Sequence, residues 1–211
     1  MKSCDCGRDL DQSGLCEMCY AEKIGIAARV KEALGSKRAV EEFSIEKFRP
    51  EFETDRRALN LAANFTALSN LYLCGPVGCG KTHIATIALR RLIERGLFGR
   101  IMLPSEVCRE AWSQSSQVMK SEFIRRIAAL PGLVLDDMGA EPPTDDTRQV
   151  LFEIINRRWL AKGGGLIVTS NLSLDELAQR FGDDRITSRL FEMCELVQWP
   201  ANAPDRRMKK S

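Results

Sequence analysis

The chain has 211 residues, of which 44% are hydrophobic and 28% are charged, and its formal net charge is +2. These values are typical of a globular protein that buries a core, and they exclude wholesale disorder. The small net charge excludes nucleic-acid binding through a strong overall field, so any such affinity must come from a local basic surface.

No apolar run reaches the roughly 18 residues that a membrane-spanning helix needs, and the first residues lack the apolar stretch of a signal peptide. We therefore expect a cytoplasmic protein. The length favours one main domain with a small appendage.

Residues 1–20 contain four cysteines in two pairs, which are Cys4 with Cys6 and Cys16 with Cys19. Four thiolates at this spacing suit a tetrahedral Zn²⁺ site, and so short a segment could not otherwise bury a core. Free thiols or a redox pair are the alternatives. We expect a zinc-binding segment that docks a partner.

Two segments connect the cysteines to the main domain. Residues 21–44 are charged and weakly amphipathic, which favours a helical linker. Pro50 disfavours helix in the residue before it, so an extended break is expected around residues 44–53. A helix is expected over residues 54–68, and the main domain is predicted to span residues 45–211.

From residue 71 onward, apolar runs alternate with helical patterns, which predicts an α/β fold with a parallel five-stranded sheet flanked by helices. The predicted strands comprise residues 71–75, 100–105, 132–137, 165–171 and 195–200. The predicted helices comprise residues 81–95, 106–129, 146–161, 174–181 and 184–194.

The stretch GPVGCGKT lies between the first of these strands and the first of these helices. It fits the pattern GxxxxGK[ST], whose glycines let backbone amides form an anion nest at a helix N-terminus. We predict that it binds ATP or ADP, with Lys81 on the β- and γ-phosphates and Thr82 in the Mg²⁺ shell. An ordinary strand-to-helix turn is the alternative. The candidates for nucleotide contact are Gly75, Pro76, Val77, Gly78, Cys79, Gly80, Lys81, Thr82 and, beside the loop on the helix surface, His83.

Polar residues follow two later strands at the sheet edge where open α/β sheets bind ligands. GLVLDD ends in Asp136, predicted to hold Mg²⁺, and Asp137, predicted to polarise the attacking water. A strand that simply ends in a polar loop would give the same pattern. GLIVTSN ends in Asn171, which could contact the water or the γ-phosphate, or could cap the next helix, although Ser173 suits that cap better.

The stretch GPVGCGKT, a P-loop pattern, is followed in order by LVLDDMGAE, LIVTSNLSLDEL and RFGDDRITSRLFEMCE. With these blocks, residues 45–211 closely resemble AAA+ ATPases of the DnaC/DnaI/IstB group, which comprises replicative helicase loaders and the ATPase helpers of insertion-sequence transposition. The resemblance implies an ASCE-type sheet of order 5-1-4-3-2, ATP-dependent self-assembly into a homo-oligomer and contact with single-stranded DNA. The cysteine segment also resembles a part of some helicase loaders, which have an N-terminal zinc module that grips the helicase.

The resemblance implies roles for the residues at the sheet edge. Residues 75–82 look like Walker A, Asp136 and Asp137 like Walker B, and Asn171 like sensor 1. Many AAA+ proteins have Asp-Glu where this chain has Asp-Asp, so hydrolysis is expected to be slow. Glu141 is a second candidate for the catalytic carboxylate.

The resemblance also implies roles for three arginines. Arg189 looks like the arginine finger that enters a neighbouring subunit's site, with Arg185 as its companion, whereas the alternative makes both of them helix-surface residues. Arg207 matches a sensor 2 arginine. Because only a short basic tail follows Arg207, the segment around residues 48–52 is expected to cover part of the adenine.

The sequence is compatible with three functions. The favoured one is a slow ATPase that acts in DNA replication by loading or remodelling a replicative DNA helicase. A transposition helper and a nucleotide-binding adaptor with little hydrolysis are the alternatives. Basic residues that could contact DNA phosphates, or equally form solvated helix faces, are Arg90, Arg91, Arg95, Arg100, Lys120, Arg125 and Arg126.

Overall fold

The structure is a computed structural model that describes residues 28, 30–34 and 43–208. The cysteine segment at residues 1–20 and most of the expected linker lie outside the described residues. No helix among the described residues is long and apolar enough to cross a membrane.

The predicted zinc ligands all belong to the part of the chain that the structure does not describe. These ligands are Cys4, Cys6, Cys16 and Cys19. Neither the fold nor the comparisons below support the zinc ion, so the zinc site and the predicted domain boundaries stay predictions.

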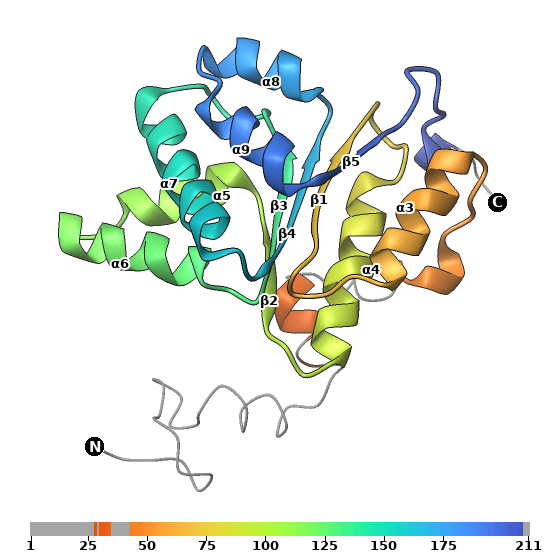
Figure 1. Cartoon of the computed structure of the whole chain (residues 1–211), viewed down its shortest axis with the longest axis horizontal. Coiled ribbons are helices and arrows are strands. Elements are labelled where there is room, and N and C mark those ends of the chain that lie inside the picture. The colour runs from red at the N-terminus through yellow and green to blue at the C-terminus, as the bar shows by residue number, and fades with distance from the viewer. Residues whose placement is uncertain (1–27, 29, 35–42, 209–211) are drawn as a thin grey trace, which may run out of the picture.

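A parallel sheet forms the centre of the molecule (Figure 1). Its strands are β1 (Asn70–Cys74), β2 (Gly99–Met102), β3 (Gly132–Met138), β4 (Gly165–Ser170) and β5 (Glu195–Gln198). They lie in the order β2-β3-β4-β1-β5, which confirms the predicted order 5-1-4-3-2. β3 begins with four buried residues and β4 is buried throughout, as expected for a sheet with both faces covered.

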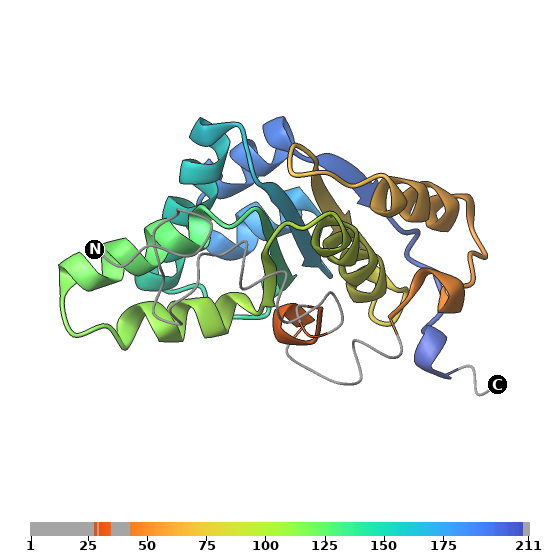
Figure 2. The ribbon, with the colours of Figure 1, turned by 90° about the horizontal axis from the view of Figure 1, so that it is seen from below.

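Helices cover both faces of the sheet, as Figure 2 shows from below. One face carries α3 (Glu53–Ala63) and α4 (Lys81–Glu94), whose buried side chains form one apolar cluster with Val30, Ala33 and Leu34. The other face carries α5 (Pro104–Trp112), α6 (Gln117–Ala128), α7 (Asp145–Ala161), α8 (Leu174–Phe181) and α9 (Arg185–Met193). Two short 3₁₀ helices complete the described elements: η1 (Ile45–Lys47) precedes α3 and η2 (Arg206–Met208) follows β5.

The predicted single helix over residues 106–129 is wrong, because the segment forms two helices, α5 and α6. The chain breaks at the polar run 113–116, where serine side chains compete for backbone hydrogen bonds. The Ser116 hydroxyl accepts a hydrogen bond from the Met119 amide at 3.2 Å, so it caps the new helix. α5 starts earlier than predicted, with Pro104 in its first turn.

Arg158 on α7 is buried and joins the connection between α6 and β3 to the first residue of β4. Its guanidinium donates to the carbonyl oxygens of Ala128 at 2.9 Å, Leu130 at 3.0 Å and Gly165 at 2.8 Å. Burial lowers its pKa to about 10, so the group stays charged at neutral pH. The three carbonyl groups therefore depend on one side chain.

Replacement of Arg158 by Met should destabilise the fold by about 3 kcal/mol, because buried carbonyl groups would lose their donor. In thermal denaturation this corresponds to a Tm lower by roughly 6–12 °C. Arg157→Met is the matched control, since Arg157 is exposed and pairs with Glu153 on the same helix. Equal Tm values for the two variants would contradict this account of Arg158.

Candidate nucleotide-binding site

The glycine-rich loop connects β1 to α4 in a conformation that only glycine adopts easily. Gly78 and Gly80 have φ values of 78° and 112°, in the left-handed region where a side chain is strained. A Cβ on Gly80 would also lie 2.9 Å from the ring of Phe48. The loop thus presents its backbone amides at the N-terminus of α4, where an anion is favoured.

The side chain of Lys81 connects this loop to the end of β4. Only 5% of Lys81 is exposed. Its ammonium donates to the carbonyl oxygens of Gly75 at 2.8 Å and Pro76 at 2.9 Å, and to Oδ1 of Asn171 at 2.8 Å. Two predicted site residues that lie 90 positions apart are therefore in direct contact.

Asp136 lies between two hydroxyl groups that come from different elements. Thr82 Oγ1 on α4 donates to it at 3.0 Å, and Thr169 Oγ1 on β4 donates at 2.7 Å. Burial raises the pKa of Asp136, the neighbouring Asp137 adds to the rise, and the two threonine hydrogen bonds oppose it. A hydroxyl beside a carboxylate provides the hard oxygen ligands that Mg²⁺ prefers, so these residues fit that ion.

Thr169 was not among the predicted site residues, yet its hydroxyl also accepts a hydrogen bond from the Asp137 amide at 2.9 Å. The sequence sign of this role was a threonine that directly follows the apolar residues of GLIVTSN. In the fold this threonine is fully buried. Next to it, the register of β3 and β4 shifts between Leu135 and Met138, which is a bulge at the two aspartates. Bulges of this kind re-aim side chains near functional sites.

The bulge places Asp137 and Glu141 in contrasting environments. Asp137 has a φ of 59°, which is strained for a residue with a side chain, and is exposed at the edge of the sheet. Glu141 is buried, and its carboxylate accepts the Gly139 amide at 3.0 Å within its own loop. Burial raises the pKa of Glu141. Of the two acids, Asp137 is the one open to a ligand.

Arg206 contacts the P-loop directly, although it too was not among the predicted site residues. Its Nε donates to the carbonyl oxygen of Cys79 at 2.8 Å, and its guanidinium lies 4.8 Å from the centre of the Phe48 ring. It also pairs with Asp55, which is fully buried. Trp199 donates to the same carboxylate at 2.7 Å. The C-terminal segment is thereby held on the glycine loop.

Asp55 stays ionised at the centre of this contact. Burial alone would raise its pKa, but hydrogen bonds from Trp199, from the Phe52 and Glu51 amides and from Arg206 hold the pKa below its usual value. One buried carboxylate therefore joins α3, the end of β5 and η2.

Arg207, the predicted sensor 2 arginine, points elsewhere. It is largely exposed, and its Nε and Nη2 donate to the carboxylate of Asp205 at 3.0 and 2.9 Å. Asp205 itself lies on the P-loop, because a Cβ on Gly78 would be only 1.9 Å from its Oδ1. Arg207 therefore lies one residue from the loop contact and keeps its guanidinium toward solvent.

The segment that was expected to cover the adenine lies against the first turn of α4. Phe48 is buried, and its ring meets the ring of His83 edge to face at 5.2 Å. His83 also contacts the Ser44 carbonyl oxygen at 2.8 Å, and burial lowers its pKa. His83 is therefore turned toward the segment before α3 and away from the glycine loop.

Arg185 and Arg189 lie on α9, and their described contacts are with α7 and with their own helix and its N-terminal flank. Arg185 pairs with Asp183, and Arg189 donates to Asn156 on α7. In the described residues neither arginine touches the P-loop of the same chain.

The cap of α8 leaves the end of β4 available to the site. Ser173 caps α8 by accepting the Glu176 amide, as predicted. Asn171 is therefore not needed as the cap and makes its contact with Lys81 instead.

This site belongs to a P-loop ATP-binding protein of the AAA+ class. The glycine loop lies between a strand and a helix, the lysine after it is buried, the acid has two hydroxyl partners, and the sheet has the order of that class. Residues 26–211 match the family described as IstB-like ATP binding protein. The chain belongs to this family.

Individual relatives agree with this assignment. An ATP-binding protein of insertion sequence IS21 from Pseudomonas aeruginosa is 23% identical over 172 residues, which is 80% of this chain and 63% of that protein. The replicative helicase loader DnaI of Bacillus subtilis is 29% identical over 111 residues, or 53% of this chain and 36% of DnaI. The alignments thus span less than two thirds of either relative.

Among solved structures, the crystal structure of the DnaC helicase loader matches with a TM-score of 0.66 and 26% identity. The match covers 78% of this chain and 100% of that chain. AMPPCP-bound DnaA from Aquifex aeolicus matches with a TM-score of 0.65 at 24% identity over 79% of this chain and 52% of that chain, which supports the fold.

Removal of the Arg206 side chain should destabilise the protein by about 3 kcal/mol, because Asp55 would remain buried without its cation. Arg206→Ala should also weaken ATP binding, since the Cys79 carbonyl group would lose its donor. Urea unfolding and calorimetry with ATP and Mg²⁺ measure the two effects.

Arg207→Ala is the control for stability, and an exposed ion pair such as that with Asp205 is worth at most about 1 kcal/mol. If Arg207→Ala were the more destabilising of the two substitutions, the role assigned to Arg206 would be wrong.

Proposed function

We propose that this ATP-binding protein is a slow ATPase that assembles on single-stranded DNA and loads or remodels a replicative DNA helicase. The observation that carries the proposal is the contact of Lys81 with Asn171 beside the acid pair, because the residues that we expect to contact phosphate, metal and water then lie together at one sheet edge. The likeness to DnaI in sequence and to DnaC in structure supports the role in loading.

Each residue at this edge has a chemical task in the proposed reaction. The amides of the glycine loop and Lys81 would bind the β- and γ-phosphates in place of the acceptors that Lys81 now contacts. Thr82 and Asp136 would hold Mg²⁺, which supplies positive charge to the phosphate oxygens. The water oxygen bonds to the γ-phosphorus as the bond to the β–γ bridging oxygen breaks, and ADP and phosphate leave.

Two more residues would act on the attacking water. Asp137, exposed at the bulge, would accept its proton, and Asn171 would hydrogen-bond it. Because the side chain of Asp is shorter than that of Glu, we expect a longer distance from its carboxylate to the water and slow turnover. The arginine finger of a second copy, Arg189, would neutralise the charge that develops on the transferred phosphoryl group.

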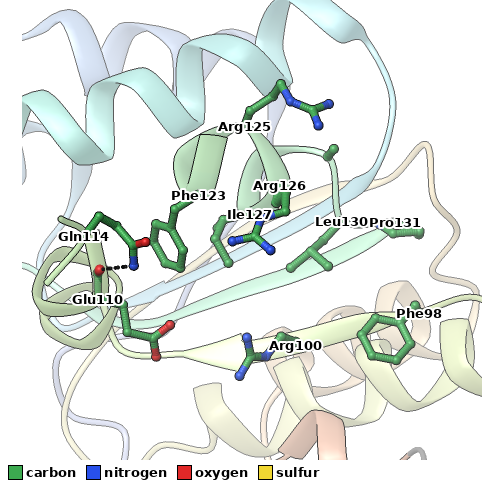
Figure 3. A pocket seen from close by; sticks show the side chains of 11 residues that line it. Phe98, Arg100, Glu110, Gln114, Phe123, Arg125, Arg126, Ile127, Leu130 and Pro131 are labelled. Carbon is green, nitrogen blue, oxygen red and sulfur yellow. Dashed lines mark hydrogen bonds between the residues drawn. The ribbon is translucent and has the colours of Figure 1, made fainter. Parts of the chain in front are cut away.

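A cavity of about 770 Å³ beside the edge strand β2 supports the proposed contact with single-stranded DNA. Figure 3 shows Arg100 on β2 and Arg126 on α6 on facing walls, with the rings of Phe98 and Phe123 beside them. Arginines bind backbone phosphates and apolar walls accept unstacked bases.

Two of the basic residues at the C-terminal end of α4 and just after it are less available for DNA. Arg91 pairs with Glu94, and Arg95 donates to the Phe65 carbonyl oxygen. The proposed DNA contact therefore rests on the cavity beside β2.

A role as a transposition helper is the second candidate function. It is favoured by the family match and by the IS21 relative, both of which name insertion-sequence ATP-binding proteins. The two candidates share the ATP site and the assembly and differ in the partner, which is a replicative helicase in one case and a transposase in the other.

Steady-state hydrolysis tests the ATPase. Lys81→Ala should lower the rate at least about 10²-fold, and Arg189→Ala about 10³-fold, because each removes a charge that the transition state needs. Calorimetry should show lost ATP affinity for the first variant and retained affinity for the second. An unchanged rate in both variants would leave a nucleotide-binding adaptor as the better description.

Fluorescence anisotropy with a labelled oligonucleotide tests the DNA contact. Arg100→Ala and Arg126→Ala should each weaken binding of single-stranded DNA and reduce its salt dependence by roughly one charge. Arg57→Ala is the control, because Arg57 lies on α3 across the sheet and pairs with Glu195. Equal losses in all three variants would remove the cavity as the DNA site.

Pull-down with the purified partner proteins separates the two candidate functions. Capture of the replicative helicase by the full chain, with loss when residues 1–40 are removed, is the expected result. Capture of a transposase in its place would establish the helper role.

A further inference from the structure

Three residues of α7 lie on the side of the helix that faces α9. Phe152, Asn156 and Trp159 are spaced i, i+4 and i+7, so they lie on one side of the helix. Arg185 and Arg189 are spaced i and i+4 on α9, and both guanidinium groups lie over this side of α7. All three α7 residues are half-buried. We call Phe152, Asn156 and Trp159 the aromatic clamp.

The clamp fixes the guanidinium of Arg189 from several directions. Its central carbon lies 4.7 Å from the centre of the Phe152 ring and 5.2 Å from the centre of the Trp159 ring. Its Nε donates to Asn156 Oδ1 at 2.7 Å, and its Nη1 donates to the Arg185 carbonyl oxygen at 3.0 Å. A long side chain that otherwise samples many rotamers is therefore held in one.

The contacts of Arg189 fix its side chain but do not include a carboxylate that would neutralise its charge. Arg185, one turn away on the same helix, pairs with Asp183 at 2.6 Å and shares the Phe152 ring at 4.8 Å. Within the residues that the structure describes, Arg189 forms no ion pair. Because Asp183 compensates the charge of Arg185, Arg189 carries the positive charge here that lacks a carboxylate partner among the described residues, and an external anion would pair with it.

We infer that the aromatic clamp positions Arg189 for contact with the γ-phosphate of ATP bound to a second copy of this chain. This inference rests on the proposed function, and it adds Phe152, Trp159 and Asn156 as positioning residues for the reaction. An arginine that is fixed before assembly loses little further rotamer freedom when it meets the phosphate. Displacement of a reacting group by about 1 Å can lower a rate about 10²-fold.

The Arg158 side chain shows how a purely structural arginine differs. It lies on the same helix as the clamp, is almost fully buried and uses its terminal nitrogens on three carbonyl oxygens. Arg189 is half-buried and stacks on rings, and none of its contacts in the described residues is with a carboxylate. The contrast indicates that Arg189 is kept accessible to a partner.

Kinetic constants of single variants give the first part of the test. Phe152→Leu and Trp159→Leu should each lower kcat about 10- to 100-fold, with KM and the calorimetric Kd for ATP within about 2-fold of the unsubstituted protein. Phe152→Tyr and Trp159→Phe should retain most of the activity, because the ring remains. Arg157→Ala, on the exposed side of the same helix, is the matched control and should leave kcat unchanged.

Mixing of variants gives the second part. Lys81→Ala lacks a working ATP site but keeps its finger, whereas Arg189→Ala lacks the finger but keeps its ATP site. Equal mixtures of these two should regain activity that neither has alone. Phe152→Leu should be rescued by Lys81→Ala in the same way, and a Lys81→Ala/Phe152→Leu double variant should fail to rescue Arg189→Ala.

The outcomes separate the inference from the proposed function. If Lys81→Ala and Arg189→Ala rescue each other but Phe152→Leu and Trp159→Leu hydrolyse ATP normally, the clamp is overturned and the trans arginine stands. If those first two variants do not rescue each other, the trans arginine of the proposed function fails, and the inference fails with it. Should Phe152→Leu not fold, Asn156→Ala removes the Nε hydrogen bond alone and is expected to lower kcat without changing KM.

Discussion

The hydroxyl of Thr169 determines the geometry of the acidic end of β3. It donates to the Asp136 carboxylate and accepts from the Asp137 amide, so one side chain on β4 orients the first acid and the backbone of the second. The bulge between the strands makes this possible by turning Asp137 outward while Asp136 stays between Thr82 and Thr169. Sheet topology brings the remaining groups to this point. β1 lies between β4 and β5, so Asn171 after β4 can contact Lys81, the first residue of α4 after the loop that follows β1.

The strands, the P-loop and the acid pair could be predicted because each depends on local pattern: alternation of apolar runs with helical patterns, glycine spacing, and acids at a strand end. The strand order was implied only by the resemblance to AAA+ ATPases, because no local pattern shows which strands are neighbours. The break between α5 and α6 was missed because a short polar run such as 113–116 also occurs on the exposed side of a continuous helix, and here the serine side chains end the helix. The choice between Arg206 and Arg207 could not be made from sequence. Two adjacent arginines differ only in which way the turn of η2 directs them, and the buried carboxylate of Asp55 decides that.

The contacts of Arg189 illustrate a different limit. Spacing shows that residues 152, 156 and 159 share one side of a helix, but no local pattern shows which helix packs on that side. The two surfaces meet because α7 and α9 cover the same face of the sheet. Such contacts between helices belong to tertiary structure, so a single sequence gives no sign of them.

The Arg206 contact has a consequence for how the protein is made in the cell. The glycine loop leaves the ribosome early, but the arginine that binds its Cys79 carbonyl group lies 127 residues later in the chain. Its carboxylate partner lies 151 residues before it. Because domains fold as synthesis proceeds from the N-terminus, a nascent chain could form the sheet up to β4 and still lack this wall of the pocket. Arg206 is therefore the last of the described pocket residues to be synthesised.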